Sequence, residues 1–243
     1  MDFADFACYT IVIPKKRGFF MRDTILQSIE QDRLVVILRG LANTDLVPTL
    51  HALHTGGVRL VEITFCANGS ISDTDTAKNI ALAAERFDGK LLVGAGTVLT
   101  EAQAALAKSA GASFILSPNT DSAVIAKTRE LDMVAIPGAF TPTEAQNAHA
   151  AGADIVKLFP ASVLGSSYIK ALRAPLSQLR LMAVGGIDLD NMTEYLAAGA
   201  CSVGIGSNIV SRSHVKEGDF ETIRELAEKY AARAKGEPHV SAH

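Results

Sequence analysis

Short apolar segments typical of β-strands alternate with segments of helical spacing eight times between residues 33 and 235. A three-residue motif, in which glycine stands between two small residues, recurs before alternate strands, as in Ala110-Gly111-Ala112 and Ala198-Gly199-Ala200. No Gly-x-Gly-x-x-Gly follows the first strand, which disfavours a dinucleotide-binding sheet. Repeated units of roughly 25 residues predict an α/β fold, a single-domain (β/α)8 TIM barrel, over an open doubly wound sheet.

The expected boundaries follow from these patterns and from glycine and proline positions. We expect the barrel to occupy residues 21–236, after an N-terminal appendage at residues 1–20 and before a C-terminal tail at residues 237–243. The expected strands are residues 33–39, 58–65, 90–95, 113–117, 133–137, 154–159, 179–184 and 201–205. The expected helices are a leading helix at 23–31, then 44–55, 72–86, 100–110, 121–131, one opening at 141, then 166–172, 189–198 and 219–235.

The composition and the order of residues argue against several classes of function. A formal net charge of −3 gives no reason to expect nucleic acid or an anionic membrane as a partner. No apolar run is long enough to span a bilayer, and the basic residues of the N-terminus follow its apolar part, which is the wrong order for a signal peptide. Cys8, Cys66 and Cys201 form no disulfide framework, so we expect a cytoplasmic protein.

A lysine interrupts the apolar run at residues 154–161 and constrains the chemistry most. A buried lysine loses hydration, so its pKa falls, and a neutral amine attacks carbonyl carbons to form an imine. Side chains alternate along a strand, so Lys157, Glu62 and Arg39 can all face the barrel interior. Taken alone, Lys157 could equally be a lysine whose amine reaches water; three ionisable groups in one interior favour a site.

Glycine-rich turns follow the seventh and eighth strands. Gly185-Gly186 and Gly204-Ile205-Gly206-Ser207 lie where many barrels bind a phosphate, although both could simply be tight turns. His51 and His54 have no third ligand at metal spacing, and neither Ser117 nor Ser207 has partners for a catalytic triad. We therefore expect no metal and no cofactor.

Seven motifs, in this order, resemble the KDPG/KHG aldolases, which act on 2-keto-3-deoxy-6-phosphogluconate (KDPG) and 2-keto-4-hydroxyglutarate (KHG). The resemblance extends from about Leu34 to Val210. The motifs are Val36-Ile37-Leu38-Arg39-Gly40, Val61-Glu62-Ile63-Thr64, Val93-Gly94-Ala95-Gly96-Thr97-Val98-Leu99, Ser117-Pro118-Asn119, Ile136-Pro137-Gly138, Val156-Lys157-Leu158-Phe159-Pro160 and Ala183-Val184-Gly185-Gly186-Ile187.

This resemblance implies a metal-free class I pyruvate aldolase, usually a homotrimer. It implies that Lys157 forms the Schiff base and that Glu62 moves protons. Further implied contacts to a phosphorylated sugar acid come from Arg39, Thr97, Pro118 and Phe159 on the pyruvate side, and from Gly185, Gly186, Gly206 and Ser207 around the phosphate.

Two departures bear on the substrate. Many gluconate-type members carry an arginine where this chain has Cys66, so other groups must bind the carboxylate. Ala183-Val184 precedes the glycine pair, as in galactonate-type members, where gluconate-type members often have Pro-Thr. We therefore expect cleavage of 2-dehydro-3-deoxy-6-phosphogalactonate (KDPGal) to pyruvate and D-glyceraldehyde 3-phosphate, with KDPG as a possible second substrate.

Three alternatives stay open from the sequence. The chain could be a KDPG or KHG aldolase instead. It could be a phosphate-binding barrel isomerase or epimerase, in which Lys157 and Glu62 act as acid and base without an imine. It could also be a non-catalytic sugar-phosphate binding barrel, although that function gives no reason to bury both side chains.

Overall fold

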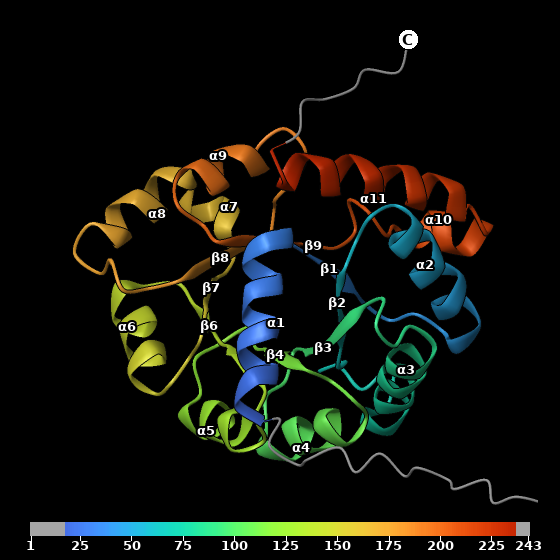
Figure 1. The fold of residues 1–243 in the computed structure, drawn as a ribbon, viewed down its shortest axis with the longest axis horizontal. Helices are drawn as coiled ribbons and strands as arrows, with labels where there is room; N and C mark the ends of the chain where they lie inside the picture. Colours follow the sequence, from blue (N-terminus) through green and yellow to red (C-terminus); the bar gives the residue numbers. More distant parts are fainter. Residues whose placement is uncertain (1–17, 237–243) are drawn as a thin grey trace, which may run out of the picture.

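A computed structural model describes residues 18–236, and its strands form one parallel barrel surrounded by helices (Figure 1). The strands are β1 Leu34–Leu38, β2 Leu60–Thr64, β3 Leu92–Gly96, β4 Phe114–Leu116, β5 Val134–Ile136, β6 Gly138–Ala139, β7 Val156–Leu158, β8 Leu181–Val184 and β9 Ser202–Ile205. The helices are α1 Gly18–Asp32, α2 Asn43–Thr55, α3 Asp73–Arg86, α4 Glu101–Ser109, α5 Ser122–Glu130, α6 Pro142–Ala150, α7 Ala161–Leu164, α8 Ser166–Arg173, α9 Met192–Ala197, α10 Arg212–Glu217 and α11 Phe220–Ala234.

The expected (β/α)8 barrel is confirmed, with one strand position divided in two. The strand order is β5-β4-β3-β2-β1-β9-β8-β7-β6, so the two ends of the sheet are consecutive in sequence. Only Pro137 separates β5 from β6, and proline has no N–H to donate to a ladder. Its carbonyl still accepts from the Lys157 N–H at 2.9 Å, and the Ala135 carbonyl accepts from Asp154 at 3.0 Å. These bonds close the barrel across the division.

Four of the helices that the sequence predicted, α3 to α6, begin at residues whose side chains cap them. Thr141 and Glu144 form a capping box at the start of α6, with Pro142 in the first turn. Ser72, Thr100 and Asp121 cap α3, α4 and α5. α7 and α10, of four and six residues, were not expected, and α1 begins five residues earlier than predicted.

The predictions for the two ends of the chain concern mostly residues outside the described part. Residues 18–20 of the expected appendage at 1–20 belong to α1. Residues 1–17 and the expected tail at 237–243 lie outside the described residues. Within the part of the chain that the structure describes, no helix is long and apolar enough to cross a membrane.

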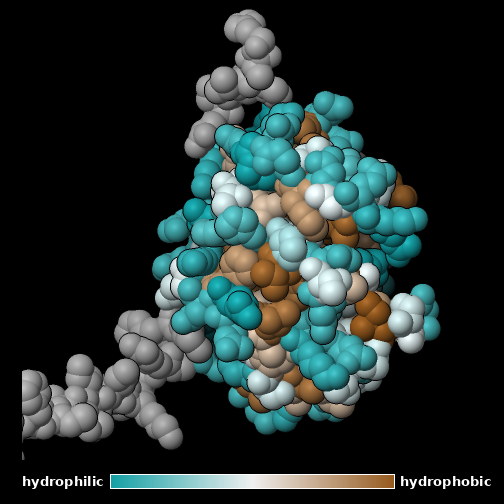
Figure 2. Space-filling model, turned by 90° about the vertical axis from the view of Figure 1, so that its right-hand side faces the viewer, coloured by the Kyte–Doolittle hydropathy of each residue, from teal (hydrophilic) through white to brown (hydrophobic). Residues whose placement is uncertain are grey.

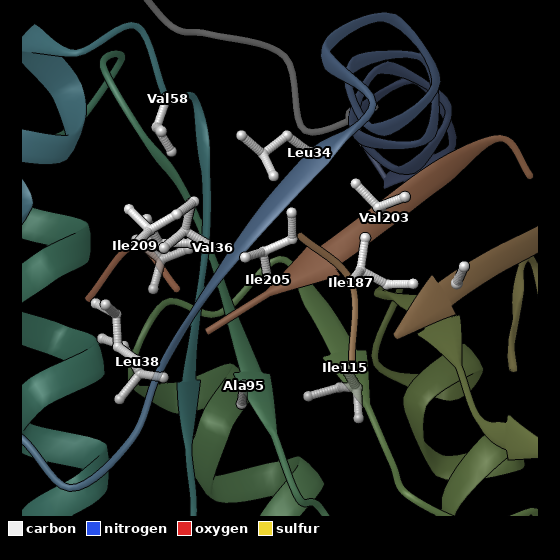
Figure 3. Packing of buried hydrophobic residues seen from close by; sticks show 14 of the residues in the cluster. Leu34, Val36, Leu38, Val58, Ala95, Ile115, Ile187, Val203, Ile205 and Ile209 are labelled. Atoms are coloured by element: carbon white, nitrogen blue, oxygen red, sulfur yellow. The ribbon is translucent and has the colours of Figure 1, made fainter. Parts of the chain in front are cut away.

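Apolar residues form an outer and an inner layer. Between strands and helices, Leu34, Val36 and Leu38 of β1 pack with Val203 and Ile205 of β9 (Figure 3). The inner layer fills the barrel with residues of β1, β2, β4, β5 and β8 and with Ile155, which precedes β7: Val35, Leu60, Phe114, Leu116, Val134, Ile136, Ile155, Met182 and Val184. The expected strand alternation is therefore confirmed.

α1 covers the end of the barrel at which the strands begin (Figure 1). Ile25, Leu26 and Ile29 on this helix are buried in the inner layer. The Arg180 guanidinium lies 2.9 Å from the Glu30 carboxylate and links the end of α1 to the segment before β8. With that end covered, access to the interior is from the end at which the strands finish.

Candidate active site

A cavity of about 500 Å³ lies at the carboxyl ends of the strands, where (β/α)8 barrels place their active sites. It brings together all the substrate-site and catalytic residues that the sequence indicated, from seven strands or the loops that follow them. These are Arg39, Glu62, Thr97, Pro118, Lys157, Phe159, Val184, Gly185, Gly186, Gly206 and Ser207.

Lys157 is the central residue of β7 and is only 6 % exposed. Its neighbours Val156 and Leu158 face the helices, so Lys157 faces the cavity. Burial lowers the pKa of the Lys157 amine; the Glu62 carboxylate opposes this shift, and the Arg39 guanidinium adds to it. The amine also lies 4.7 Å from the centre of the Phe159 ring. These surroundings favour a neutral, nucleophilic amine.

Glu62 is the middle residue of β2 and is 1 % exposed. Burial raises the pKa of its carboxyl group, and the positive charges of Lys157 and Arg39 oppose that rise. A carboxyl group whose pKa is moved toward neutrality can both accept and return a proton. A Cβ built on Gly96 of β3 would overlap the Glu62 carboxylate, so glycine at that position makes room for it.

Backbone conformations available mainly to glycine shape the rim. Gly185 and Gly186 have positive φ of 93° and 74° in succession, and the Gly185 carbonyl accepts from the Ser162 N–H at 3.0 Å. Thr97, after β3, has φ of 54° although it is β-branched, a conformation that costs of order 1–3 kcal/mol. Such strain clusters at functional sites, and Thr97 lines the cavity.

The loop after β9 adds residues that the sequence did not indicate. Asn208, Ser211 and Arg212 line the cavity beside Ser207, and the Asn208 amide donates to the Ile187 carbonyl at 2.9 Å. This bond ties the β9 loop to the loop that carries Gly185 and Gly186. Arg212 begins the short α10, which Ser211 caps by accepting from the His214 N–H at 3.1 Å; this serine was the sequence signal for the helix. The other added lining residues are Ile37, Leu41, Ile187 and Val210, and Gly204 and Ile205 of the expected glycine-rich turn line the cavity as well.

Other candidates lie elsewhere. Cys66 is half-buried and is not among the residues that line the cavity. His54 on α2 contacts Arg59, and burial followed by that positive charge lowers the pKa of its ring. Among residues 18–236, no three histidine, cysteine, aspartate or glutamate side chains are placed to hold a metal ion.

The fold and cavity together define a (β/α)8 barrel with a lysine and a glutamate buried below a glycine-rich rim. The family model of the KDPG and KHG aldolases matches residues 25–226. The protein named "Probable 2-dehydro-3-deoxy-6-phosphogalactonate aldolase" of Rhizobium meliloti is 41 % identical over 177 residues, 72 % of this chain and 81 % of that one. The 2-dehydro-3-deoxy-phosphogluconate aldolase of Treponema pallidum is 34 % identical, over 85 % of this chain and 95 % of its own.

Solved structures agree with these relatives. A native KDPGal structure has a TM-score of 0.73 at 32 % identity, over 84 % of this chain and 95 % of that one. The KDPG aldolase of Legionella pneumophila, with pyruvate captured at low pH as a covalent carbinolamine, has a TM-score of 0.75 at 27 % identity, over 84 % and 96 %. The chain belongs to the KDPG and KHG aldolase family, and it is therefore an aldolase, a lyase.

Proposed function

We propose that this chain is a class I aldolase that cleaves KDPGal to pyruvate and D-glyceraldehyde 3-phosphate. The observation that carries the proposal is the burial of Lys157 and Glu62 in one cavity, with the pKa of the amine lowered and that of the carboxyl raised. The name of the Rhizobium meliloti relative and the carbinolamine captured in the Legionella pneumophila enzyme support it.

The proposed reaction begins at the C2 carbonyl of the substrate. The neutral Lys157 amine adds to C2, and loss of water gives a protonated imine. The imine draws the electron pair of the C3–C4 bond toward nitrogen as the bond breaks, which leaves an enamine on Lys157. Glu62 accepts the C4 hydroxyl proton as the aldehyde forms and returns a proton to C3. Hydrolysis of the resulting imine releases pyruvate and the free amine.

The two anionic ends of the substrate have different partners in this proposal. Arg39, Thr97 and Pro118 contact the pyruvate side of the substrate. Many gluconate-type members use an arginine there as well, and this chain has Cys66 at the position of that arginine. Phe159 packs beside the imine, as its ring near the amine suggests. Gly185, Gly186, Gly206 and Ser207 surround the phosphate, and Arg212 adds a positive charge to the lining near them.

Reduction with borohydride tests the imine. Borohydride added with pyruvate should attach a stable adduct to Lys157, and EDTA should not prevent it because the proposed chemistry uses no metal. An isomerase or epimerase that used Lys157 only as an acid or base would leave no adduct. A metal-dependent reaction would be lost in EDTA and restored by Mg²⁺ or Zn²⁺.

The other substrate that has support is KDPG, because relatives at 32–34 % identity are named for it. KDPGal and KDPG differ at the C4 hydroxyl. Val184, at the end of β8, is 3 % exposed and lines the cavity next to the glycine pair. An apolar wall cannot hydrogen-bond either epimer, so it discriminates weakly between them. We expect good use of KDPGal with a modest preference over KDPG.

Val184→Thr should therefore raise kcat/KM for KDPG by about two- to tenfold, the value of one neutral hydrogen bond. Threonine has nearly the shape of valine, so the cavity should keep its form. Parallel kcat/KM measurements on both epimers test this, with Val184→Ala as the control that changes the wall without adding a hydroxyl. A wild type strongly selective for KDPG, or an unchanged epimer ratio in Val184→Thr, would contradict the assignment of Val184.

We also propose a cytoplasmic homotrimer. The thiols of Cys66 and Cys201 are free, which suits a reducing compartment. Leu99, Phe140 and Val163 are exposed apolar side chains near the carboxyl ends of the strands. Apolar side chains also gather on the side of the barrel that carries α2 and α3 (Figure 2). Exposed apolar surface of this kind marks interfaces between proteins. Sedimentation velocity of the purified chain tests the number of subunits.

A further inference from the structure

The hydroxyl of Thr64 is buried without a partner in the strand that carries Glu62. Thr64 is the last residue of β2 and is 3 % exposed. Its Oγ1 has no hydrogen-bond partner among the atoms of residues 18–236. Buried hydroxyl groups nearly always have a partner, so an unpaired one beside a candidate acid–base group calls for an explanation.

Thr64 and Glu62 lie on the same face of β2. Leu60, two residues before Glu62, belongs to the barrel interior, whereas Val61 and Ile63 belong to the layer under the helices. By the same alternation Glu62 and Thr64 both face inward. The Glu62 Oε2 atom is also buried without a partner in the described part of the chain. Two unpaired polar atoms of complementary character, a hydroxyl and a carboxylate oxygen, therefore lie on one strand face.

The spacing of the two residues allows one water molecule between them. Residues two apart on a strand have Cα atoms about 6.6 Å apart, and two hydrogen bonds of about 2.8 Å to one water join side-chain atoms up to about 5.6 Å apart. In the ladder with β3, Glu62 lies opposite Gly94 and Thr64 opposite Gly96, so that strand supplies no competing side chain. In the ladder with β1, Ile37 lies opposite Glu62, and Arg39 follows Leu38, the partner of Ile63. A water there would have the hydroxyl and the carboxylate as partners.

We propose that Thr64 is a positioning residue for the aldol reaction, whose hydroxyl hydrogen-bonds through one water to the Glu62 carboxylate and holds it ready for proton transfer. Held in this way, the Glu62 carboxylate can accept the C4 hydroxyl proton and return a proton to C3 in a single orientation. This inference rests on the proposed function of Glu62 and adds a residue for which the resemblance implies no role.

The hydrogen bond from Thr64 would also affect the pH at which Glu62 ionises. The charged groups that face Glu62 are Lys157 from β7 and Arg39 from β1; both favour the carboxylate form, against burial. A donor that stabilises the carboxylate acts in the same direction as these charges. Removing it should raise the pKa of Glu62. The fall in activity on acidification should then begin at a higher pH than in the wild type.

The test uses two matched substitutions in the full chain. Thr64→Val keeps the shape and removes the hydroxyl; Thr64→Ser keeps the hydroxyl and removes only a methyl group. Three quantities are measured for each variant: borohydride trapping with pyruvate, exchange of pyruvate methyl hydrogens with deuterated water, and the pH dependence of kcat. Urea unfolding is measured alongside, and Thr64→Ala replaces Thr64→Val if the latter does not fold.

We expect Thr64→Val to trap pyruvate as the wild type does and to show a cooperative urea unfolding transition, since valine keeps the shape of threonine. Its hydrogen exchange and kcat should fall roughly 10- to 100-fold, the value of a hydrogen bond to a charged group. The acid side of its pH profile should move to higher pH. Thr64→Ser should recover most of the exchange.

Contrary outcomes separate this inference from the proposed function. If the wild type traps no pyruvate, the imine proposal fails, and the inference about Thr64 falls with it. If the wild type traps pyruvate but Thr64→Val exchanges hydrogens normally, only the role of Thr64 is wrong. Equal losses in Thr64→Val and Thr64→Ser, with an unshifted pH profile, would assign Thr64 to packing and overturn the inference.

Discussion

Lys157→Ala should abolish cleavage of KDPGal and covalent capture of pyruvate, with a loss of at least about 10⁴-fold on the scale of a lost covalent nucleophile. Lys157 is the lysine that lines the cavity within the described part of the chain. A single-turnover assay and mass spectrometry after borohydride measure the two losses. The fold should survive, because Lys157 is buried with a lowered pKa and its removal takes away a polar group that burial disfavours.

Lys157→Met is the matched control, since methionine fills the space of the lysine stem without an amine. Both variants should give the wild-type circular dichroism spectrum, and Lys157→Met should unfold at a urea concentration no lower than the wild type. Residual cleavage within about tenfold of the wild type in either variant would mean that another residue is the nucleophile. Loss of folding in both would leave a structural role as the better account of Lys157.

The barrel could be predicted because its pattern is both local and repeated. The apolar run around Lys157 and the glycine motifs before alternate strands each define one strand–helix unit. Eight such units in succession predict a closed barrel. Strand alternation alone predicts that Lys157, Glu62 and Arg39 face one interior. The carboxyl ends of parallel strands converge, so residues far apart in sequence met in one cavity as expected.

The features that escaped prediction are short or depend on geometry. Gly138–Ala139 is too short for a period-two pattern and follows Pro137, which breaks the ladder. The four-residue α7 and six-residue α10 carry too few residues for helical periodicity. Arg212, the first residue of α10, lines the cavity, and its position there depends on tertiary packing. The unpaired Thr64 hydroxyl likewise depends on the positions of all neighbouring atoms.

The cavity itself explains why the lysine and the glutamate are found together. Burial disfavours the charged forms of Lys157 and Glu62, and the charge of each residue opposes the pKa shift of the other. A pair of this kind can keep an amine reactive and a carboxyl able to exchange protons within one water-poor space. Substitution of Glu62 tests its role as proton carrier separately from the role of Lys157 as nucleophile.

Glu62→Gln should keep imine formation and slow turnover by roughly 10²-fold or more, the usual contribution of a positioned acid–base group. Glutamine has the shape of glutamate but cannot take up the C4 hydroxyl proton. Pyruvate should still be trapped on Lys157 by borohydride, whereas exchange of its methyl hydrogens with deuterated water should fall with turnover. Because burial raises the pKa of Glu62, wild-type kcat should decrease as pH falls through that raised pKa, and this limb should be absent from the variant.

Glu144→Gln provides the matched control, because it removes the same charge at the exposed cap of α6, outside the residues that line the cavity. It should lower the free energy of unfolding by about 1 kcal/mol at most, through the weakened cap, and leave kcat unchanged. If Glu62→Gln no longer traps pyruvate while Glu144→Gln does, Glu62 acts before the imine forms. If Glu62→Gln turns over as fast as the wild type, the proton carrier is another group, and the pairing of Glu62 with Lys157 is structural.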